Sequence, residues 1–220
     1  MAGGLVLMGV AATILPVASA MVFHGATQLA SNGSRAFVLR AHIRWRTVGW
    51  QAAGAVAALA LHLAMSFTPD RPTLLLVLGA IPFVARALPK SSWLDASRPL
   101  SAAACGFVTT GLQLIAGVAG PLLDVWFLNV AFDRKEIVAT KAATQALSHS
   151  FKILRFAPLI GSTDGVSVEI LAASAIAALA GTAVGTRILE RVSERDFRKW
   201  TGWTVLAIGT VYIAQAIAGC

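Results

Sequence analysis

Residues 20–39 read AMVFHGATQLASNGSRAFVL, and this stretch recurs in altered form at residues 137–156 as IVATKAATQALSHSFKILRF. A shift of 117 residues aligns the two copies without a gap and places Gln28 on Gln145. In both copies the polar residues recur every three or four positions, which puts them on one face of a helix. They are His24, Gln28, Ser31 and Arg35 in the first copy and Lys141, Gln145, Ser148 and Lys152 in the second. The repeat therefore predicts two apolar helices, each with one polar, cationic stripe.

The composition indicates that these helices lie in a lipid bilayer. Hydrophobic residues make up 57% of the 220-residue chain and charged residues 13%, with a mean hydropathy of +0.74. Because soluble domains average about 25% charged residues, we predict an integral membrane protein in contact with lipid. The net charge of +8 would suggest nucleic acid in a soluble chain. Here most arginines and lysines lie in short loops between apolar runs, where they set orientation, so we expect no nucleic-acid partner.

Apolar runs outside the stripes predict the remaining membrane segments. Residues 2–20 are interrupted at Pro16, which predicts a discontinuous segment. Residues 47–67 and 73–88 are expected to cross the bilayer as an out-and-back pair. Glycines divide residues 101–130, which predicts two half-length helices that meet at Gly120-Pro121.

Further signals mark the ends of the striped helices and the last two spans. We expect the first striped helix to continue through Asn32-Gly33, because the matching residues of the second copy have no turn character. Asp133-Arg134-Lys135-Glu136 is predicted to cap the second. Residues 166–189 and about 200–218 predict two final spans, separated by a mixed-charge loop at 190–199.

The positive-inside rule predicts the topology. Placing the basic loops 40–46, 85–98 and 187–199 in the cytoplasm gives the two copies opposite orientations. We therefore predict an all-α integral membrane fold of two inverted repeats, residues 1–98 and 99–220. Each repeat has a broken-helix hairpin, a polar-striped helix and two further transmembrane helices.

The two predicted repeats differ at their start. Residues 101–119 of the second repeat have no counterpart before Gly3, so the first repeat is expected to lack its first half-helix. Two explanations stay open at this point. Either that half-helix is absent from the protein, or the true start codon lies further upstream.

The striped helices carry cations without internal partners. Arg35, Lys141, Lys152 and Arg155 lie in segments that contain no Asp or Glu, and a charge at mid-membrane costs about 2.5–3.5 kcal/mol. Snorkelling of the side chain to the membrane surface is an alternative for Lys141 and Arg155. For Arg35 and Lys152, an anionic ligand would supply the missing charge.

The remaining polar groups of the stripes can donate hydrogen bonds to such an anion, and backbone N–H groups at the glycine break can do the same. We therefore predict a site for a small oxyanion, with no metal or cofactor. Its expected residues are Gln28, Ser31, Asn32, Arg35, Gly120, Pro121, Lys141, Thr144, Gln145, Ser148, His149 and Lys152.

Each of these side chains also has a structural interpretation. Gln28 and Gln145 can join helices by hydrogen bonds, and His24, His62 and His149 can be packing residues. Asp124, an acid inside an apolar run, can form a salt bridge with Lys141 or carry a coupling proton, and the salt bridge is the favoured interpretation.

Short motifs in both halves resemble one known family. In the second half they are Ala119-Gly120-Pro121-Leu122-Leu123, Val138-Ala139-Thr140-Lys141-Ala142, Gln145, His149 and Lys152, and in the first half His24-Gly25-Ala26, Gln28-Leu29 and Ser31-Asn32-Gly33-Ser34-Arg35. They are similar to the signature of the TauE/SafE sulfite exporters, a family of multi-pass transporters. The resemblance implies a two-repeat inner-membrane carrier for sulfite, organosulfonates or related sulfur anions, with these positions along the pathway. The sequence departs from the family in its missing first glycine-rich half-helix.

The leading hypothesis is a secondary transporter, an exporter or facilitator, that exposes an anion site alternately on the two sides. A membrane-embedded enzyme is an alternative, with His24, His149 and Asp124 as candidate groups, but no His-x-x-x-His, Glu-x-x-His or phosphate-binding loop is present. A non-transporting membrane subunit is the third hypothesis. A homo-oligomer also stays open.

Overall fold

The computed structural model describes residues 2–88, 91, 93–161, 165–189 and 194–219, and these residues form helices with no strand among them. Within this described part, four helices are long and apolar enough to cross a membrane. They include Trp45–Met65 (α3), Pro99–Ala116 (α5) and the apolar parts of Val168–Leu189 (α8) and Glu194–Ala218 (α9). The prediction of an all-helical, multi-pass membrane protein is confirmed.

The first segment of the chain is broken as predicted. Helix α1 (Ala2–Ile14) has 13 residues, too few to span a bilayer. Helix α2 (Val17–Val38) starts directly after Pro16. The proline nitrogen has no hydrogen to donate to an earlier carbonyl, so the helix before it cannot continue. It continues through Asn32 and Gly33, which confirms that this dipeptide is not a turn.

Two helices follow the basic loop, which contains a short 3-10 turn at Arg40–His42. The first is α3, and the second is α4 (Arg71–Ala87). The α4 start is fixed by Asp70, whose carboxylate accepts a hydrogen bond of 2.8 Å from the Thr73 N–H.

The second hairpin contains α5 and α6 (Gly120–Trp126). The break lies where predicted, but the two helices are not both half-length: α5 has 18 residues and α6 only 7. Gly117 ends α5 with φ of 78°, a backbone conformation that suits glycine. A Cβ there would also overlap the Met8 side chain of α1.

Helix α7 (Arg134–Phe156) begins with the predicted cap. The Asp133 carboxylate accepts from the Glu136 N–H at 2.8 Å, and Glu136 accepts from the Asp133 N–H at 3.0 Å. The hydrogen bond from the Glu136 N–H is the largest of the causes that lower the pKa of Asp133. A second 3-10 turn, Ala157–Leu159, follows α7.

The last two helices are α8 and α9. The predicted mixed-charge loop is corrected in part, because α9 already begins at Glu194 and residues 194–199 are helical. Residues 190–193 of that loop, and 162–164 of the loop before α8, lie outside the described residues. In the apolar stretch Val168–Gly185 of α8 no residue is buried inside the chain, so this surface needs lipid contact.

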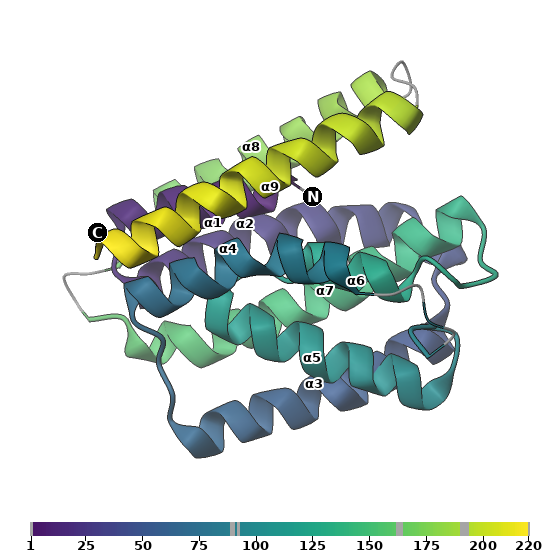
Figure 1. Ribbon diagram of the computed structural model, residues 1–220, viewed down its shortest axis with the longest axis horizontal. Helices are drawn as coiled ribbons and strands as arrows, with labels where there is room; N and C mark the ends of the chain where they lie inside the picture. The colour runs from purple at the N-terminus through teal and green to yellow at the C-terminus, as the bar shows by residue number, and fades with distance from the viewer. Residues whose placement is uncertain (1, 89–90, 92, 162–164, 190–193, 220) are drawn as a thin grey trace.

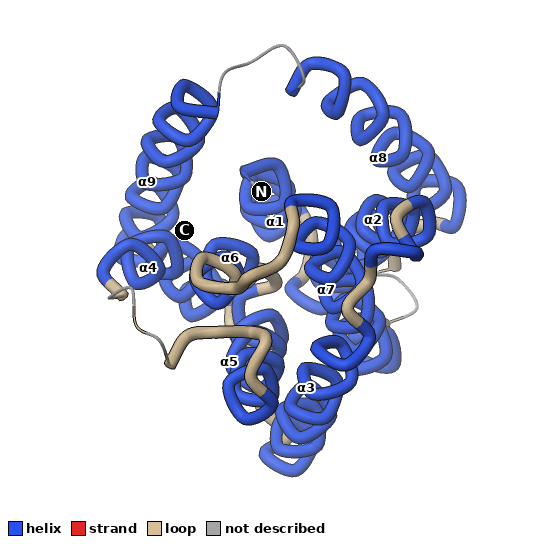
Figure 2. The backbone as a smooth tube through the Cα atoms, turned by 90° about the vertical axis from the view of Figure 1, so that its right-hand side faces the viewer, coloured by secondary structure: helices blue, strands red, loops and turns tan. Residues whose placement is uncertain are grey.

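The striped helices α2 and α7 pack against each other at the centre of the bundle (Figure 1). Helix α3 lies against both α5 and α7, α8 lies against α2, and α4 packs along α9. In the end-on view, α1 lies between α8 and α9 (Figure 2). The main apolar core joins α1, α2, α4 and α9 and includes Leu5, Met8, Met21, Leu74 and Leu78, all fully buried.

Candidate anion site

A cavity of about 430 Å³ lies among α1, α2, α7, α8 and the break between α5 and α6. Two kinds of group line it: small residues that keep it open, and polar residues that are mostly uncharged. The lining residues are Gly3, Gly4, His24, Gln28, Ser31, Asn32, Arg35, Gln113, Val118, Ala119, Gly120, Gln145, His149, Gly181, Thr182 and Gly185. The cavity is therefore polar although the helices around it are apolar.

Several polar groups of this cavity have no partner in the described part of the chain. No hydrogen bond is found there for the side chains of Gln28, Asn32 or Gln145, although Asn32 is only 4% exposed. No described carboxylate pairs with the Arg35 guanidinium either. Gln28, Asn32 and Arg35 share one face because they are spaced by four and three residues on α2. They offer amide and guanidinium donors to a ligand.

Deeper in the protein, Lys152 lies beside two histidines. Its Nζ is 2.7 Å from Nδ1 of His24 and 3.0 Å from the Gly117 carbonyl oxygen, and the side chain is fully buried. The rings of His24 and His149 are 5.6 Å apart between centroids. His149 is held by Gln113, whose amide nitrogen is 2.8 Å from Nδ1. Both histidines line the cavity, whereas Lys152 does not.

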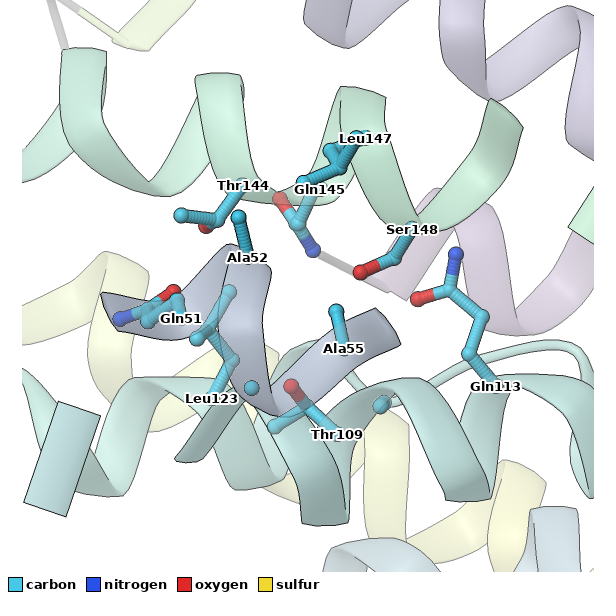
Figure 3. Close-up of a pocket in the computed structure, with 12 residues that line it drawn as sticks. Gln51, Ala52, Ala55, Thr109, Gln113, Leu123, Thr144, Gln145, Leu147 and Ser148 are labelled. Atoms are coloured by element: carbon cyan, nitrogen blue, oxygen red, sulfur yellow. The ribbon is translucent and has the colours of Figure 1, made fainter. Parts of the chain in front are cut away.

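A second, much smaller cavity of about 10 Å³ lies on the other side of Gln145 (Figure 3). It has room for about one water molecule. Thr144, Gln145 and Ser148 reach it from α7, Gln51 from α3, and Thr109 and Gln113 from α5. Ser148 shares a 2.9 Å hydrogen bond with Thr110. Gln113, Ala119 and Gln145 line both cavities, so they form the wall between them.

The structure brings most of the predicted site residues to these cavities. The large cavity contains Gln28, Ser31, Asn32, Arg35, Gly120, Gln145 and His149, and the small one contains Thr144, Gln145 and Ser148. Lys141, Lys152 and Pro121 line neither. Ser31 already shares a 2.8 Å hydrogen bond with Thr182 of α8.

Two predicted cations are placed differently from the expectation of unpartnered charges. The Lys141 ammonium forms an ion pair with Asp124, which confirms the salt bridge favoured from the sequence. Lys152 hydrogen-bonds to His24 and Gly117 behind the cavity wall. The structure also separates Lys152 from Arg35, because Arg35 lies 11 residues after His24 on α2, or about 16 Å along the helix axis. The two charges do not meet at one point.

Arg155, the fourth cation, is buried against another part of the chain. It is 8% exposed and its Nη2 donates to the Phe67 carbonyl oxygen at 3.1 Å. It thereby ties the end of α7 to the loop after α3.

Sequence reasoning misses several residues of the large cavity. Gln113 lies on the hairpin helix, where a lone glutamine four residues before Gly117 is the only signal. Thr182, Gly181 and Gly185 come from α8, for which the sequence predicts only an apolar span. His24, for which packing is one interpretation, lines the cavity. No group of three metal-ligating side chains occurs within the described ranges.

A bundle of membrane helices around a polar cavity, with a guanidinium that no described carboxylate pairs, is the arrangement expected of a membrane transport protein. The family described as sulfite exporter TauE/SafE matches residues 1–212 of the chain, which belongs to this family. Members of the family are membrane transporters and not enzymes. No curated protein and no solved structure matches the chain.

Proposed function

We propose that the protein carries a small sulfur oxyanion, sulfite or an organosulfonate, across the inner membrane through the 430 Å³ cavity. The observation that carries this proposal is the donor set of Arg35, Gln28, Asn32 and Gln145. These side chains face the cavity, and no described carboxylate or amide partner satisfies them. A sulfonate or sulfite group presents several acceptor oxygens and negative charge, which matches a guanidinium flanked by amides.

Alternating access between two inverted repeats is the mechanism that the arrangement supports. The shift of 117 residues carries the bounds of α2 onto those of α7 to within one residue. The same shift makes α1, α2, α3 and α4 the counterparts of α6, α7, α8 and α9. The contacts follow this correspondence: α2 packs on α8 as α7 packs on α3, and α1 packs on α9 as α6 packs on α4. Repeats of opposite orientation around one site can expose it alternately to the two sides of the membrane.

The two cavities lie in different parts of the bundle. The large cavity lies on the α2–α8 side, and the small one lies on the α3–α7 side. Gln113, Ala119 and Gln145 lie between them. In the proposed cycle the anion binds in the large cavity and leaves on the opposite side of the membrane after the two repeats rearrange. The basic loop around Arg44 faces the cytoplasm, in accordance with the positive-inside rule.

Flux in proteoliposomes tests this function. Arg35→Gln should weaken binding, because a hydrogen bond to a charged group contributes about 1.5–3 kcal/mol, which is about tenfold to a hundredfold in Kd. Radiolabelled sulfite or methanesulfonate is the transported anion, and KM for its uptake is the measurement. Unchanged KM and flux in Arg35→Gln, at equal amounts of folded protein, would refute the site.

The matched control is Arg40→Gln. Arg40 lies just after the same helix, is exposed and stacks on Phe37, and does not line the cavity. It should transport as the unmodified protein does. Equal loss in both variants would mean that overall charge near the α2 end matters, and not the cavity.

A further inference from the structure

The feature that the anion site does not explain is the buried pair of Lys152 and His24. Lys152 is fully buried, and its Nζ has two neighbours, Nδ1 of His24 at 2.7 Å and the Gly117 carbonyl oxygen at 3.0 Å. Gly25, next to His24, makes room for it, since a Cβ at Gly25 would lie 3.2 Å from Cε of Lys152. The aliphatic part of the Lys152 side chain therefore packs directly against α2 at Gly25.

The charged and titratable groups around this pair include no described carboxylate. On α7 they are His149, three residues before Lys152, and Arg155, three residues after it. His62 reaches the end of α7 from α3 and contacts Phe156, and Arg35 is the nearest charge on α2. The described parts of α1 and α5 offer only Gly4 and Gln113. The buried charge is thus not neutralised by the described protein.

The hydrogen bonds determine where the protons lie. Nε2 of His24 is 2.9 Å from the Gly4 carbonyl oxygen. A carbonyl only accepts, so Nε2 carries the proton and Nδ1 has the free lone pair. That lone pair accepts from Lys152. A second proton on His24 would place two donors face to face at 2.7 Å unless Lys152 lost one. The pair therefore holds a single exchangeable proton.

A proton can pass between this pair and the cavity only through the imidazole ring, because His24 lines the cavity and Lys152 does not. We propose that Lys152 and His24 form the site of a co-transported proton, and that the protein is a proton–anion symporter. This inference rests on the proposed anion transport and adds its driving force.

The proton step uses only these groups and a water molecule in the cavity. The Lys152 ammonium gives one proton to Nδ1 of His24, and Nε2 releases its own proton once the water has replaced the Gly4 carbonyl as its hydrogen-bond acceptor. Neutral Lys152 and a neutral His24 protonated on Nδ1 remain, and one proton has left. An anion in the cavity attracts the pair's positive charge and so keeps the proton bound. When the anion leaves, the unneutralised charge in a poorly solvated site favours release.

Two assays on the same proteoliposomes separate coupling from transport. In the first, an acidic exterior drives uphill uptake of radiolabelled methanesulfonate, an anion that stays ionised. In the second, labelled and unlabelled methanesulfonate exchange at equal pH, which needs no net proton movement. The unmodified protein should be active in both, and a pH-sensitive dye inside the vesicles should report proton entry with the anion.

His24→Asn and Lys152→Gln each remove one member of the pair. Both should lower the ratio of pH-driven accumulation to exchange by about tenfold or more, which is in the usual range of coupling between sites. His62→Asn is the matched control, a buried histidine that contacts Phe67 and Phe156 and lines neither cavity. It should keep both activities. Continued exchange also shows that a variant is folded. If Lys152→Gln loses exchange, the result for His24→Asn is used to test the role of the pair.

The outcomes separate the two proposals. Exchange without pH-driven accumulation in the unmodified protein would overturn the symport while anion transport stands. pH-driven accumulation by His24→Asn equal to that of the unmodified protein would overturn the role of this pair. Absence of methanesulfonate and sulfite movement in both assays would overturn the proposed function together with the symport.

Discussion

Helices α2 and α7 have the same polar pattern but use it differently. On α7 both stripe lysines have partners, Lys141 an ion pair with Asp124 and Lys152 hydrogen bonds to His24 and Gly117. On α2 the equivalent of Lys141 is the histidine His24, and Arg35 faces the cavity without a described ion-pair partner. Both lysines of the α7 stripe therefore have partners, whereas the arginine of the α2 stripe is left for a ligand.

The neighbours of the two helices explain this difference. Helix α5 packs closely along α3 beside α7, and only about 10 Å³ of space remains there. On the opposite side, α2 and α8 border about 430 Å³, and no described helix fills it as α5 fills its groove. The repeated pattern therefore determines which residues can face a cavity, whereas helix packing determines where in the bundle the cavity lies.

The largest effect on stability is expected where α5 packs most closely on α3. A Cβ at Gly106 of α5 would overlap the backbone carbonyl of Gln51 on α3. Because a backbone atom cannot turn away, we expect Gly106→Ala to destabilise the fold by about 3 kcal/mol, the upper part of the usual range for overpacking. Thermal unfolding in detergent is the measurement.

Glycines without close neighbours should respond differently to the same substitution. A Cβ at Gly181 on α8 would have no atom of the described residues within 4 Å, and neither would a Cβ at Gly111 on α5 itself. Alanine at either position should be neutral or slightly stabilising, since alanine is the better helix former by about 1 kcal/mol. Equal destabilisation at Gly106 and Gly181 would show that the two sides do not differ in packing.

Next in size is the ion pair that distinguishes α7 from α2. Asp124→Asn leaves the Lys141 ammonium without its partner. For a buried pair this costs about 3–5 kcal/mol, and we expect about 2 kcal/mol here because both side chains are partly exposed. The change should lower the unfolding temperature and leave the KM for anion uptake unchanged.

The double variant Asp124→Leu with Lys141→His gives α6 and α7 the residues found at the equivalent positions of the first copy, Leu7 and His24. It should recover most of the lost stability, because the unpaired charge is removed with its partner. A strong rise in KM in Asp124→Asn would instead place Lys141 in the transport site.

The sequence was sufficient to predict the elements that depend on local chemistry. The break at Pro16, the cap at Asp133, the continuation through Asn32-Gly33 and the salt bridge of Asp124 with Lys141 are all found. Each depends on residues that are near in the chain or on a charge that needs a partner. The family follows from motifs that also lie within short stretches.

The missed features depend on contacts between distant segments. The position of Lys152 behind the cavity wall requires His24 of α2 and Gly117 of the hairpin, and the helix spacing of α7 alone cannot show it. The roles of Thr182 and Gly185 require α8 to lie on α2. The length of α6 was also missed, since apolar residues continue after Trp126 while the helix does not.

The smallest predicted effect concerns the first turns of the two helices. The N-cap residues Pro16 and Asp133 are equivalent in the repeat, but only Asp133 caps its helix with a side chain. Its pKa lies below the ordinary value because the ionised carboxylate accepts the Glu136 N–H. A lowered pKa stabilises the folded helix end above the unfolded pKa of about 3.9. This contribution is lost as the pH falls through the folded pKa.

Hydrogen exchange can detect this difference between the helices. When the pH is taken below about 4, the unfolded pKa of an aspartate, the amides of the first turn of α7 should lose protection relative to their intrinsic rates, and those of the first turn of α2 should not. Asp133→Ala should reproduce the loss at neutral pH, whereas Asp133→Asn, whose amide oxygen still accepts, should keep most of the protection without its pH dependence. If the first turn of α2 loses protection to the same extent on acidification, the cause is a general loosening of the bundle and not the carboxylate at the start of α7.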